Sequence, residues 1–199
     1  MSPPHVPEIS LHLADEVHSL WQKTEDELEE IGLPPPFWAF AWAGGQGLAR
    51  YVLDHPRVVR GRRILDFATG SGMVAIAAKL AGARSVLAVD VDPWASHAVA
   101  MNALANGVEI DFMGEDLVGT LQLAEVVLAG DVFYDKTFAK HIIPWFSLMA
   151  ENGTVVLIGD PGRSYLPKDR LEALAVYEVP VTRVLEDSET KSTTVWQFV

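Results

Sequence analysis

Residues 64–93 read ILDFATGSGMVAIAAKLAGARSVLAVDVDP. An apolar run at 64–67 ends in the glycine-containing turn 68–72, and the alanine-rich segment 73–81 favours a helix. A second apolar run at 85–89 follows and ends at an acid, Asp90. Strand, glycine turn, helix, strand and acid together predict half of a doubly wound nucleotide-binding unit.

Two glycines and an acid indicate where this unit would bind a ligand. Parallel strands leave a crevice at their carboxyl ends, and Gly70 and Gly72 let the backbone approach a ligand there without an intervening side chain. Asp90 follows Asp66 by 24 residues, close to the spacing of an acid that accepts hydrogen bonds from two ribose hydroxyls. The alternative is a crossover in which the glycines only form the turn, but the two acids favour binding.

The identity of the ligand depends on Asp66. Ala75 stands where a dinucleotide fingerprint has its third glycine, and alanine is a permitted variant, so spacing alone does not exclude a dehydrogenase. A carboxylate four residues before Gly70 sits poorly against a pyrophosphate and suits a ligand with a positive centre and no phosphate. The sequence DFATGSG at 66–72 resembles the first motif of class I methyltransferases, which makes S-adenosylmethionine the expected cofactor.

The composition predicts one α/β domain over residues 1–199, with an N-terminal helical and aromatic segment at about 1–45. The formal charge of −12 argues against nucleic-acid binding and would suit a basic or lysine-bearing partner. No apolar run reaches the roughly 20 residues of a membrane span. The chain has no cysteine, and its six histidines show no metal-ligand spacing, so we expect no metal site. The N-terminus lacks a secretory or transit signal, so a cytoplasmic location is expected.

An amphipathic helix is predicted from Ser10 to Ile31. Its apolar residues recur at steps of three, four or seven: Leu13, Val17, Leu20, Trp21, Leu28 and Ile31. Five acids cluster beside them between positions 25 and 30. This acidic face is either solvated or a docking surface for a basic partner.

The segment 37–47 is first aromatic and then glycine-rich. Alternation at Trp38, Phe40 and Trp42 favours either a strand that buries one face or a lid whose rings line a cofactor or substrate pocket. Gly44 and Gly45 then suggest a loop that opens a helix to about residue 55. Backbone amides at such a start can hold a carboxylate, such as the amino acid tail of the cofactor. Trp42 and Gly45 are therefore candidate cofactor-binding residues.

The remaining elements complete a Rossmann-like, seven-stranded methyltransferase sheet. The predicted strands lie at 108–112, 124–128, 154–158, 174–181 and 193–198, and the predicted helices at 93–106 and 137–149. The last two strands are expected to form an antiparallel hairpin on a mostly parallel sheet. Asp116, after the third strand, is a candidate acceptor for the adenine amino group; Glu115 is its alternative, and a simple turn acid is another.

Further segments narrow the resemblance. Asp131-Val132-Phe133-Tyr134 looks like the Asp/Glu-x-x-Tyr/Phe motif of a group of seven-stranded protein-lysine methyltransferases. With PFWA at 36–39, WAGGQ at 42–46, GDPGR at 159–163 and STTVW at 192–196, it closely resembles the electron transfer flavoprotein β-subunit lysine methyltransferase family. The similarity runs from about Leu33 to the C-terminus. The chain departs from its relatives at Ala43, where proline is common, and at Phe67-Ala68, where Leu/Val-Gly is more usual.

The resemblance implies methylation of lysines, with the electron transfer flavoprotein β subunit as substrate. Asp131 would orient the incoming amine, since a carboxylate is a poor base for an ammonium. Phe133 and Tyr134 would flank the lysine stem and the developing methylammonium; the structural alternative is a strand-end turn with two buried rings. Asp160 and Arg163 would shape the substrate rim or form a structural ion pair.

Three functions remain open from sequence. The first is methylation of lysines in the flavoprotein β subunit. The second is methylation of another protein, such as a ribosomal protein, or of a small amine. The third is a non-catalytic cofactor-binding module, which the intact motif from Asp131 to Tyr134 speaks against.

Overall fold

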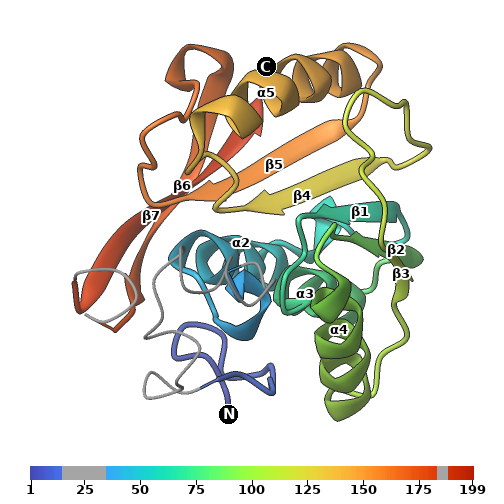
Figure 1. Ribbon diagram of the computed structural model, residues 1–199, viewed down its shortest axis with the longest axis vertical. Coiled ribbons are helices and arrows are strands. Elements are labelled where there is room, and N and C mark those ends of the chain that lie inside the picture. The colour runs from blue at the N-terminus through green and yellow to red at the C-terminus, as the bar shows by residue number, and fades with distance from the viewer. Residues whose placement is uncertain (15–34, 183–187) are drawn as a thin grey trace.

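The structure is a computed structural model that describes residues 1–14, 35–182 and 188–199. Within these residues, seven strands form one sheet in the order β3-β2-β1-β4-β5-β7-β6 (Figure 1). The strands from β3 to β5 run parallel, while β7 lies antiparallel between β5 and β6. This topology confirms the expected mostly parallel α/β sheet with an antiparallel C-terminal hairpin.

The elements follow one another in the predicted sequence order. The strands are β1 (Arg63–Phe67), β2 (Ser85–Val89), β3 (Asp111–Met113), β4 (Val126–Gly130), β5 (Val155–Asp160), β6 (Leu171–Pro180) and β7 (Thr190–Phe198). The helices are α2 (Ala43–Asp54), α3 (Met73–Leu80), α4 (Pro93–Ala105) and α5 (Lys136–Glu151), with 3₁₀ turns η1 (Phe37–Ala39), η2 (Pro56–Val58) and η3 (Lys168–Arg170). Differences from the predicted bounds fall at element ends, where local patterns are least informative.

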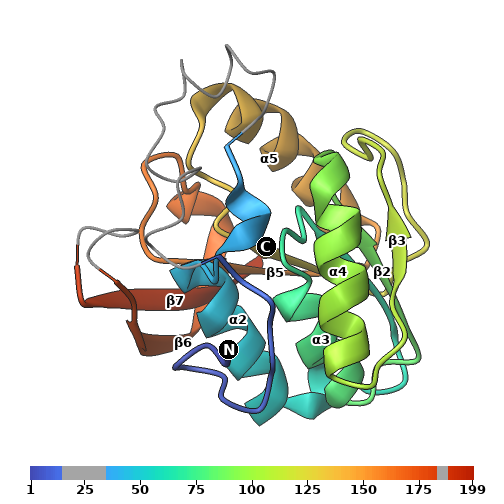
Figure 2. The same cartoon turned by 60° about the horizontal axis from the view of Figure 1, so that its bottom comes forward.

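Helices cover both faces of the sheet, with α5 on one face and α2, α3 and α4 on the other (Figures 1 and 2). Successive strand residues point to opposite faces, so Ile64 belongs to the core beneath α3 whereas Leu65 belongs to the core beneath α5. Trp145 and Phe146 of α5 fill the second core. Burying each such side chain stabilises the fold by about 1.5–3 kcal/mol. The described helices include none with the length and hydrophobicity needed to span a bilayer.

Helix α2 packs against the strand ends at a distance that only glycine permits. A Cβ atom at Gly130 would lie 2.8 Å from the Cα of Gly45. A Cβ atom on Gly44 or on Gly159 would overlap the carbonyl oxygen of the other residue. The N-terminus of α2 is therefore held directly over the carboxyl ends of β4 and β5.

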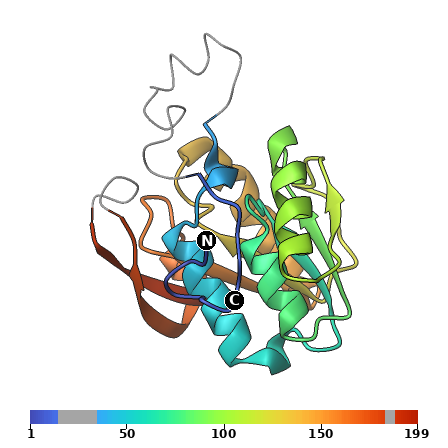
Figure 3. The ribbon, with the colours of Figure 1, turned by 90° about the horizontal axis from the view of Figure 1, so that it is seen from below.

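The N-terminal arm, residues 1–14, lies across the helices on the face opposite α5 (Figure 3). Ile9 and Leu11 are fully buried in the core beneath α2 and α3. The backbone N–H of His12 donates to Oδ1 of Asn102 on α4 at 2.6 Å, and Nδ2 of Asn102 donates to the Ser71 carbonyl at 2.8 Å. Asn102 thus links the arm to the glycine turn.

Two local predictions have a different outcome. The alternation at 38–42 forms no strand, because backbone bonds from Phe37 to the Pro35 carbonyl and from Ala39 to the Pro36 carbonyl fold the chain into the tight turn η1. The helix predicted from Ser10 to Ile31 lies mostly outside the described residues, and its described positions 10–14 are not helical. The single-domain prediction for 1–199, with its N-terminal segment, stays a prediction.

Candidate active site at the strand ends

Four neighbouring parallel strands carry an aspartate at the same edge of the sheet. Asp66 is the next-to-last residue of β1 and Asp160 is the last residue of β5. Asp90 and Asp131 directly follow β2 and β4. The sheet order places these acids in the sequence Asp90, Asp66, Asp131, Asp160 along this edge. This is the edge at which ligands bind in open parallel sheets.

Asp66 lies beneath the glycine turn and is 1% exposed. Its Oδ2 accepts hydrogen bonds from the Thr69 hydroxyl at 2.5 Å and from the Ala75 N–H at 2.9 Å. Burial raises the pKa of the Asp66 carboxyl to about 7, against the opposing effect of these two hydrogen bonds and with a further contribution from Asp90. Asp66 therefore ties the turn to the first turn of α3, and its contact with a cofactor stays a prediction.

Asp90 fixes the other side of the turn. Its Oδ2 accepts from the Gly70 N–H at 2.8 Å and its Oδ1 from the Asp92 N–H at 3.0 Å, and burial raises the pKa of this carboxyl. Gly70 and Gly72 have φ values of 53° and 80°, which non-glycine residues rarely adopt. Because the Gly70 N–H already bonds a carboxylate, the turn suits a ligand without phosphates. Each Asp90 oxygen keeps a second lone pair for a ribose hydroxyl.

Asp116 lies three residues beyond the end of β3. The Asp90 N–H donates to the carbonyl of Met113 at 3.3 Å, so β3 ends beside the Asp90 region. The exposed Asp116 side chain accepts from the Val118 N–H at 2.9 Å, a turn contact typical of aspartate. This position is compatible with the expected adenine contact, which stays a prediction.

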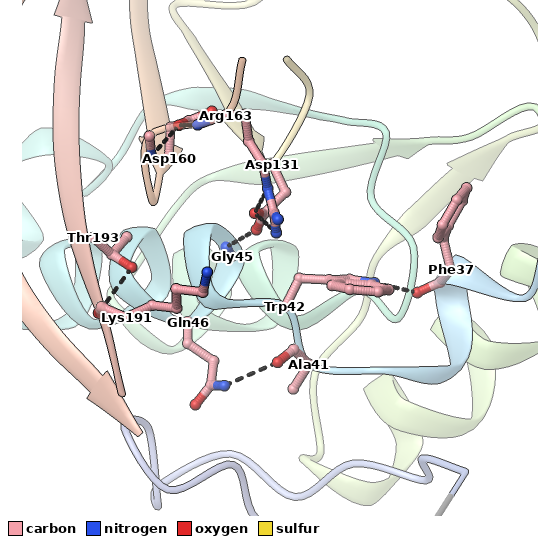
Figure 4. Close-up of polar contacts among 11 residues, drawn as sticks. Phe37, Ala41, Trp42, Gly45, Gln46, Asp131, Asp160, Arg163, Lys191 and Thr193 are labelled. Atoms are coloured by element: carbon pink, nitrogen blue, oxygen red, sulfur yellow. Dashed lines mark hydrogen bonds and ion pairs between the residues drawn. The ribbon is translucent and has the colours of Figure 1, made fainter. Parts of the chain in front are cut away.

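Asp131 joins two elements that are remote in the sequence (Figure 4). Its Oδ2 accepts from the Gly45 N–H at 3.0 Å, and its Oδ1 accepts from Nε and Nη2 of Arg163 at 3.0 and 2.6 Å. The N-cap residue of α2, Trp42, makes no side-chain cap, so Asp131 caps this helix from outside. Asp131 has a φ of 58°, and its N–H donates to the Gly159 carbonyl at 2.9 Å.

An aromatic cluster lies beside Arg163, the ion-pair partner of this acid. The guanidinium carbon of Arg163 lies 6.0 Å from the centre of the Trp42 ring, and the Trp42 indole N–H donates to the Phe37 carbonyl at 2.8 Å. The Phe37 ring is 5.5 Å from the ring of Tyr134, which is 52% exposed. Trp42, Phe37 and Tyr134 form an aromatic cluster beside the Asp131–Arg163 pair, and we refer to these three residues as the aromatic rim.

Phe133 differs from the expectation that its ring flanks the substrate lysine. The ring is 0% exposed and packs in the core beneath α5, 6.4 Å from Phe146. It is the neighbouring Tyr134 that points outward. The turn therefore contains one buried and one exposed ring, which also differs from the alternative in which both rings are buried.

Asp160 and Arg163 are linked, but not as a side-chain pair. Asp160 is 1% exposed, and its Oδ1 accepts from the backbone N–H groups of Gly162 and Arg163 at 2.6 and 2.7 Å. The side-chain ion pair of Arg163 is with Asp131. Sequence reasoning named both residues but missed this pairing, because 32 positions separate Arg163 from Asp131.

The expected cofactor residues fall into two groups. Gly70, Gly72 and Asp90 lie together at the glycine turn, where the Gly70 N–H donates to Asp90, and a Cβ atom at Gly70 would be in ordinary van der Waals contact, at 3.6 Å, with the Cα of Trp38 in η1. Gly45 is different, because its N–H donates to the carboxylate of Asp131 rather than to the carboxylate of a cofactor. The first group fits a nucleoside ligand without phosphate.

Comparisons with known proteins agree with this fold. The family model for ribosomal protein L11 methyltransferase (PrmA) matches residues 50–133. The ribosomal protein L11 methylase of Lactobacillus delbrueckii subsp. bulgaricus has a similar structure, with a TM-score of 0.56 at 19% identity over 80% of each chain. Magnesium protoporphyrin IX methyltransferase from Synechocystis, solved with bound S-adenosylmethionine, has a TM-score of 0.56 at 15% identity over 78% of each chain.

The fold, the family match and the relatives described next together define a methyltransferase of the S-adenosylmethionine-dependent class, which confirms the expected cofactor. The electron transfer flavoprotein beta subunit lysine methyltransferase of Xenopus laevis is 40% identical over 205 aligned positions, covering 99% of this chain and 82% of the relative. The mouse protein of the same name is 36% identical, covering 96% of this chain and 77% of the relative. The chain belongs to the electron transfer flavoprotein beta subunit lysine methyltransferase family.

Proposed function

We propose that this protein transfers methyl groups from S-adenosylmethionine to lysine side chains of the electron transfer flavoprotein β subunit. The observation that carries the proposal is Asp131, an acid fixed at the end of β4 by α2 and Arg163 and lying beside the aromatic rim. An acid beside aromatic rings is a suitable environment for a lysine amine. The family relatives carry this substrate in their names.

On the cofactor side, the residues of the glycine turn act by binding. Asp90 accepts hydrogen bonds from the ribose hydroxyls, and Gly70 and Gly72 bring the backbone close to the ligand. Asp66 keeps the turn in shape through Thr69 and Ala75. Asp116 accepts from the adenine amino group. The bound cofactor supplies a methyl group on a sulfonium, which makes the methyl carbon electrophilic.

On the acceptor side, the residues around Asp131 position the amine. The neutral lysine nitrogen must face the methyl carbon in line with the bond that breaks, and correct positioning supplies much of the rate. Asp131 orients the amine and stabilises the positive charge that develops on nitrogen. Tyr134 and Trp42 contribute cation–π attraction and exclude water. Phe133 supports this turn from the core.

A labelled transfer assay tests the proposal. Purified protein, labelled S-adenosylmethionine and purified β subunit should give labelled lysine, located by mass spectrometry. The matched control is Asp131→Asn, which should give little label. Absence of label at high enzyme concentration would exclude the flavoprotein substrate.

The same assay separates the two alternatives. Labelling of ribosomal protein L11 or of small amines, with the β subunit unlabelled, would favour the second function. S-adenosylmethionine binding by calorimetry with no transfer to any of these acceptors would favour a non-catalytic module.

The cellular setting is also a proposal. The absence of cysteine is compatible with a cytoplasmic location, and the charge of −12 opposes contact with nucleic acid or anionic membranes. Cell fractionation tests the location. A gel-shift assay at low salt tests the nucleic-acid exclusion, and a shifted band would contradict it.

A further inference from the structure

The guanidinium of Arg163 occupies a position between an acid and an aromatic ring. Two of its N–H groups, on Nε and Nη2, donate to the same oxygen of Asp131, and its Cζ lies 6.0 Å from the centre of the Trp42 ring (Figure 4). The side chains of Arg163 and Asp131 are only 22% and 11% exposed, so water screens this pair weakly. A partly buried pair of this geometry fixes a carboxylate more firmly than a surface ion pair does.

The backbone of Arg163 is itself fixed. Asp160 is the last residue of β5, and its Oδ1 accepts from the N–H groups of Gly162 and Arg163. The Asp160 carboxylate therefore closes the turn 160–163. Gly162 has a φ of 94°, which lets the chain bend at this point. The turn therefore fixes the position of the Arg163 backbone relative to β5.

These contacts together fix the orientation of the Asp131 carboxylate. The Gly45 N–H holds Oδ2 of Asp131 from the α2 side, and Arg163 holds Oδ1 from the β5 side. With one donor group on each oxygen, the carboxylate cannot rotate about its Cβ–Cγ bond without losing a charge-assisted hydrogen bond. This leaves the remaining lone pairs of Asp131 in fixed directions.

We propose that Arg163 is a positioning residue that keeps Asp131 ionised and correctly aimed at the incoming amine, and that Asp160 sets Arg163 in place through the turn 160–163. The inference rests on the proposed function, because it assigns a role to Arg163 through Asp131. It excludes the opposite role, in which Arg163 blocks the acceptor position and must leave before lysine enters.

The charged surroundings of Asp131 give the proposal a measurable consequence. The titratable groups on the adjoining elements are Asp160 at the end of β5, Arg163 in the turn that follows, Tyr134 and Asp135 after β4, and Asp66 on the neighbouring strand β1. Helix α2 adds the partial positive charge of its N-terminus, and its first turn carries no acidic side chain. The charged residue of β7 is Lys191, two positions before Thr193, whose side chain would meet a Cβ atom built on Gly47 of α2. Removing the guanidinium should therefore make Asp131 easier to protonate.

The first measurement is independent of catalysis. Carbon-13 NMR of labelled aspartate carboxyls follows the titration of Asp131, assigned by its loss in Asp131→Asn. In Arg163→Met, the titration midpoint should rise by about one pH unit or more, because the cationic partner is gone. Arg163→Lys should show a smaller rise, since an ammonium keeps the charge but cannot place two donors in the same fork.

The second measurement is kinetic. Arg163→Met should lower kcat about 10- to 100-fold while the Kd for S-adenosylmethionine stays within about twofold. Arg163→Lys should recover part of the loss. Asp131→Asn combined with Arg163→Met should be no slower than Asp131→Asn alone, because both changes act on one carboxylate.

The control is Arg170→Met. Arg170 lies in η3, where Nη1 donates to the Ser147 hydroxyl at 3.0 Å, away from the strand-end site. This change should leave both the Asp131 titration and kcat unchanged. Asp160→Asn keeps an oxygen for the two turn N–H groups and should be mild, whereas Asp160→Ala should reproduce the Arg163→Met phenotype.

Each outcome decides the inference. An unchanged Asp131 midpoint, or a kcat equal to or above wild type in Arg163→Met, overturns it; a gain in rate would mean that Arg163 obstructs the acceptor. If the wild-type protein transfers no methyl group to the β subunit while the midpoint rises in Arg163→Met, the proposed function fails, but the control of Asp131 by Arg163 is supported.

Discussion

The two halves of the strand-end edge use the same residue type in different ways. At the glycine turn, Asp66 and Asp90 bond to groups 2 to 20 positions away in the sequence. At the end of β4, the side chain of Asp131 bonds to Gly45 and Arg163, which are 86 and 32 positions away. The first half is a local motif, and the second exists only after α2 and the turn following β5 have packed together.

This difference suggests that the acids of the glycine turn have a conformational role and that Asp131 has a chemical one. In the proposed function, the acids of the glycine turn shape a backbone that accepts the cofactor, so a change there should act mainly on binding or folding. Asp131 lies beside the aromatic rim, so a change there should act mainly on turnover. Four experiments test this difference between the two halves of the edge.

The largest effect is expected from Asp131→Asn. The amide still offers an oxygen to the Gly45 N–H, but the negative charge beside the acceptor is lost. We expect kcat to fall about 100- to 1000-fold, as for the loss of one electrostatic contact in other active sites. Calorimetry should show S-adenosylmethionine affinity within about twofold of wild type. Normal turnover would remove Asp131 from the reaction.

Gly44→Ala tests whether the acceptor half depends on close packing of α2. The new Cβ would overlap the Gly159 carbonyl and lie 2.5 Å from Oδ2 of Asp131, so helix or strand must move. We expect a loss of about 2–3 kcal/mol in the free energy of unfolding, measured in urea. Gly45→Ala is the matched control, because its Cβ meets only the mobile end of Met73, at 3.0 Å. Equal costs for the two variants would contradict the packing argument.

Asp90→Ala tests the cofactor half. Losing the acid at the end of β2 removes the ribose acceptor and releases the Gly70 N–H. The Kd for S-adenosylmethionine should rise about tenfold, equivalent to about 1.4 kcal/mol. Asp116→Ala is the comparison at an exposed position and should weaken binding less. Unchanged affinity in Asp90→Ala would take this residue out of the ribose site.

The last experiment concerns the pH dependence of stability. The pKa of Asp66 is raised from 3.8 to about 7 in the folded protein, so between these values the native state holds a proton that the unfolded state releases. The contribution of Asp66 to stability is therefore present below 3.8 and is lost as pH rises through about 7. Asp66→Asn should reduce this decline in denaturant titrations across that window. Asp90 and Asp160, whose pKa values are also raised by burial, remain in both proteins as an internal reference. Parallel pH profiles for the two proteins would contradict the assignment.

An element could be predicted from the sequence when its contacts join residues that are close together in the chain. Helix α4 was predicted at 93–106 from nearby residues, and Asp92 does cap its start by accepting the Trp94 N–H at 2.8 Å. Of the two alternatives for the alternation at 38–42, the strand does not form, because the apolar pattern does not show that the rings pack on one another, as those of Phe37 and Trp42 do at 5.8 Å. Phe133 and Tyr134 were treated alike, although only the turn after β4 decides which ring enters the core.

The sequence by itself determined the sheet, the glycine turn and the acids at the strand ends, because each depends on residues close together in the chain and on periodic burial. It also carried enough family-specific segments to indicate a lysine methyltransferase. Only the tertiary structure paired Asp131 with Gly45 and Arg163, buried Phe133 and left Tyr134 exposed. Those outcomes depend on the close approach of α2 to β4 and β5, which glycines at 44, 130 and 159 permit and which no local pattern encodes.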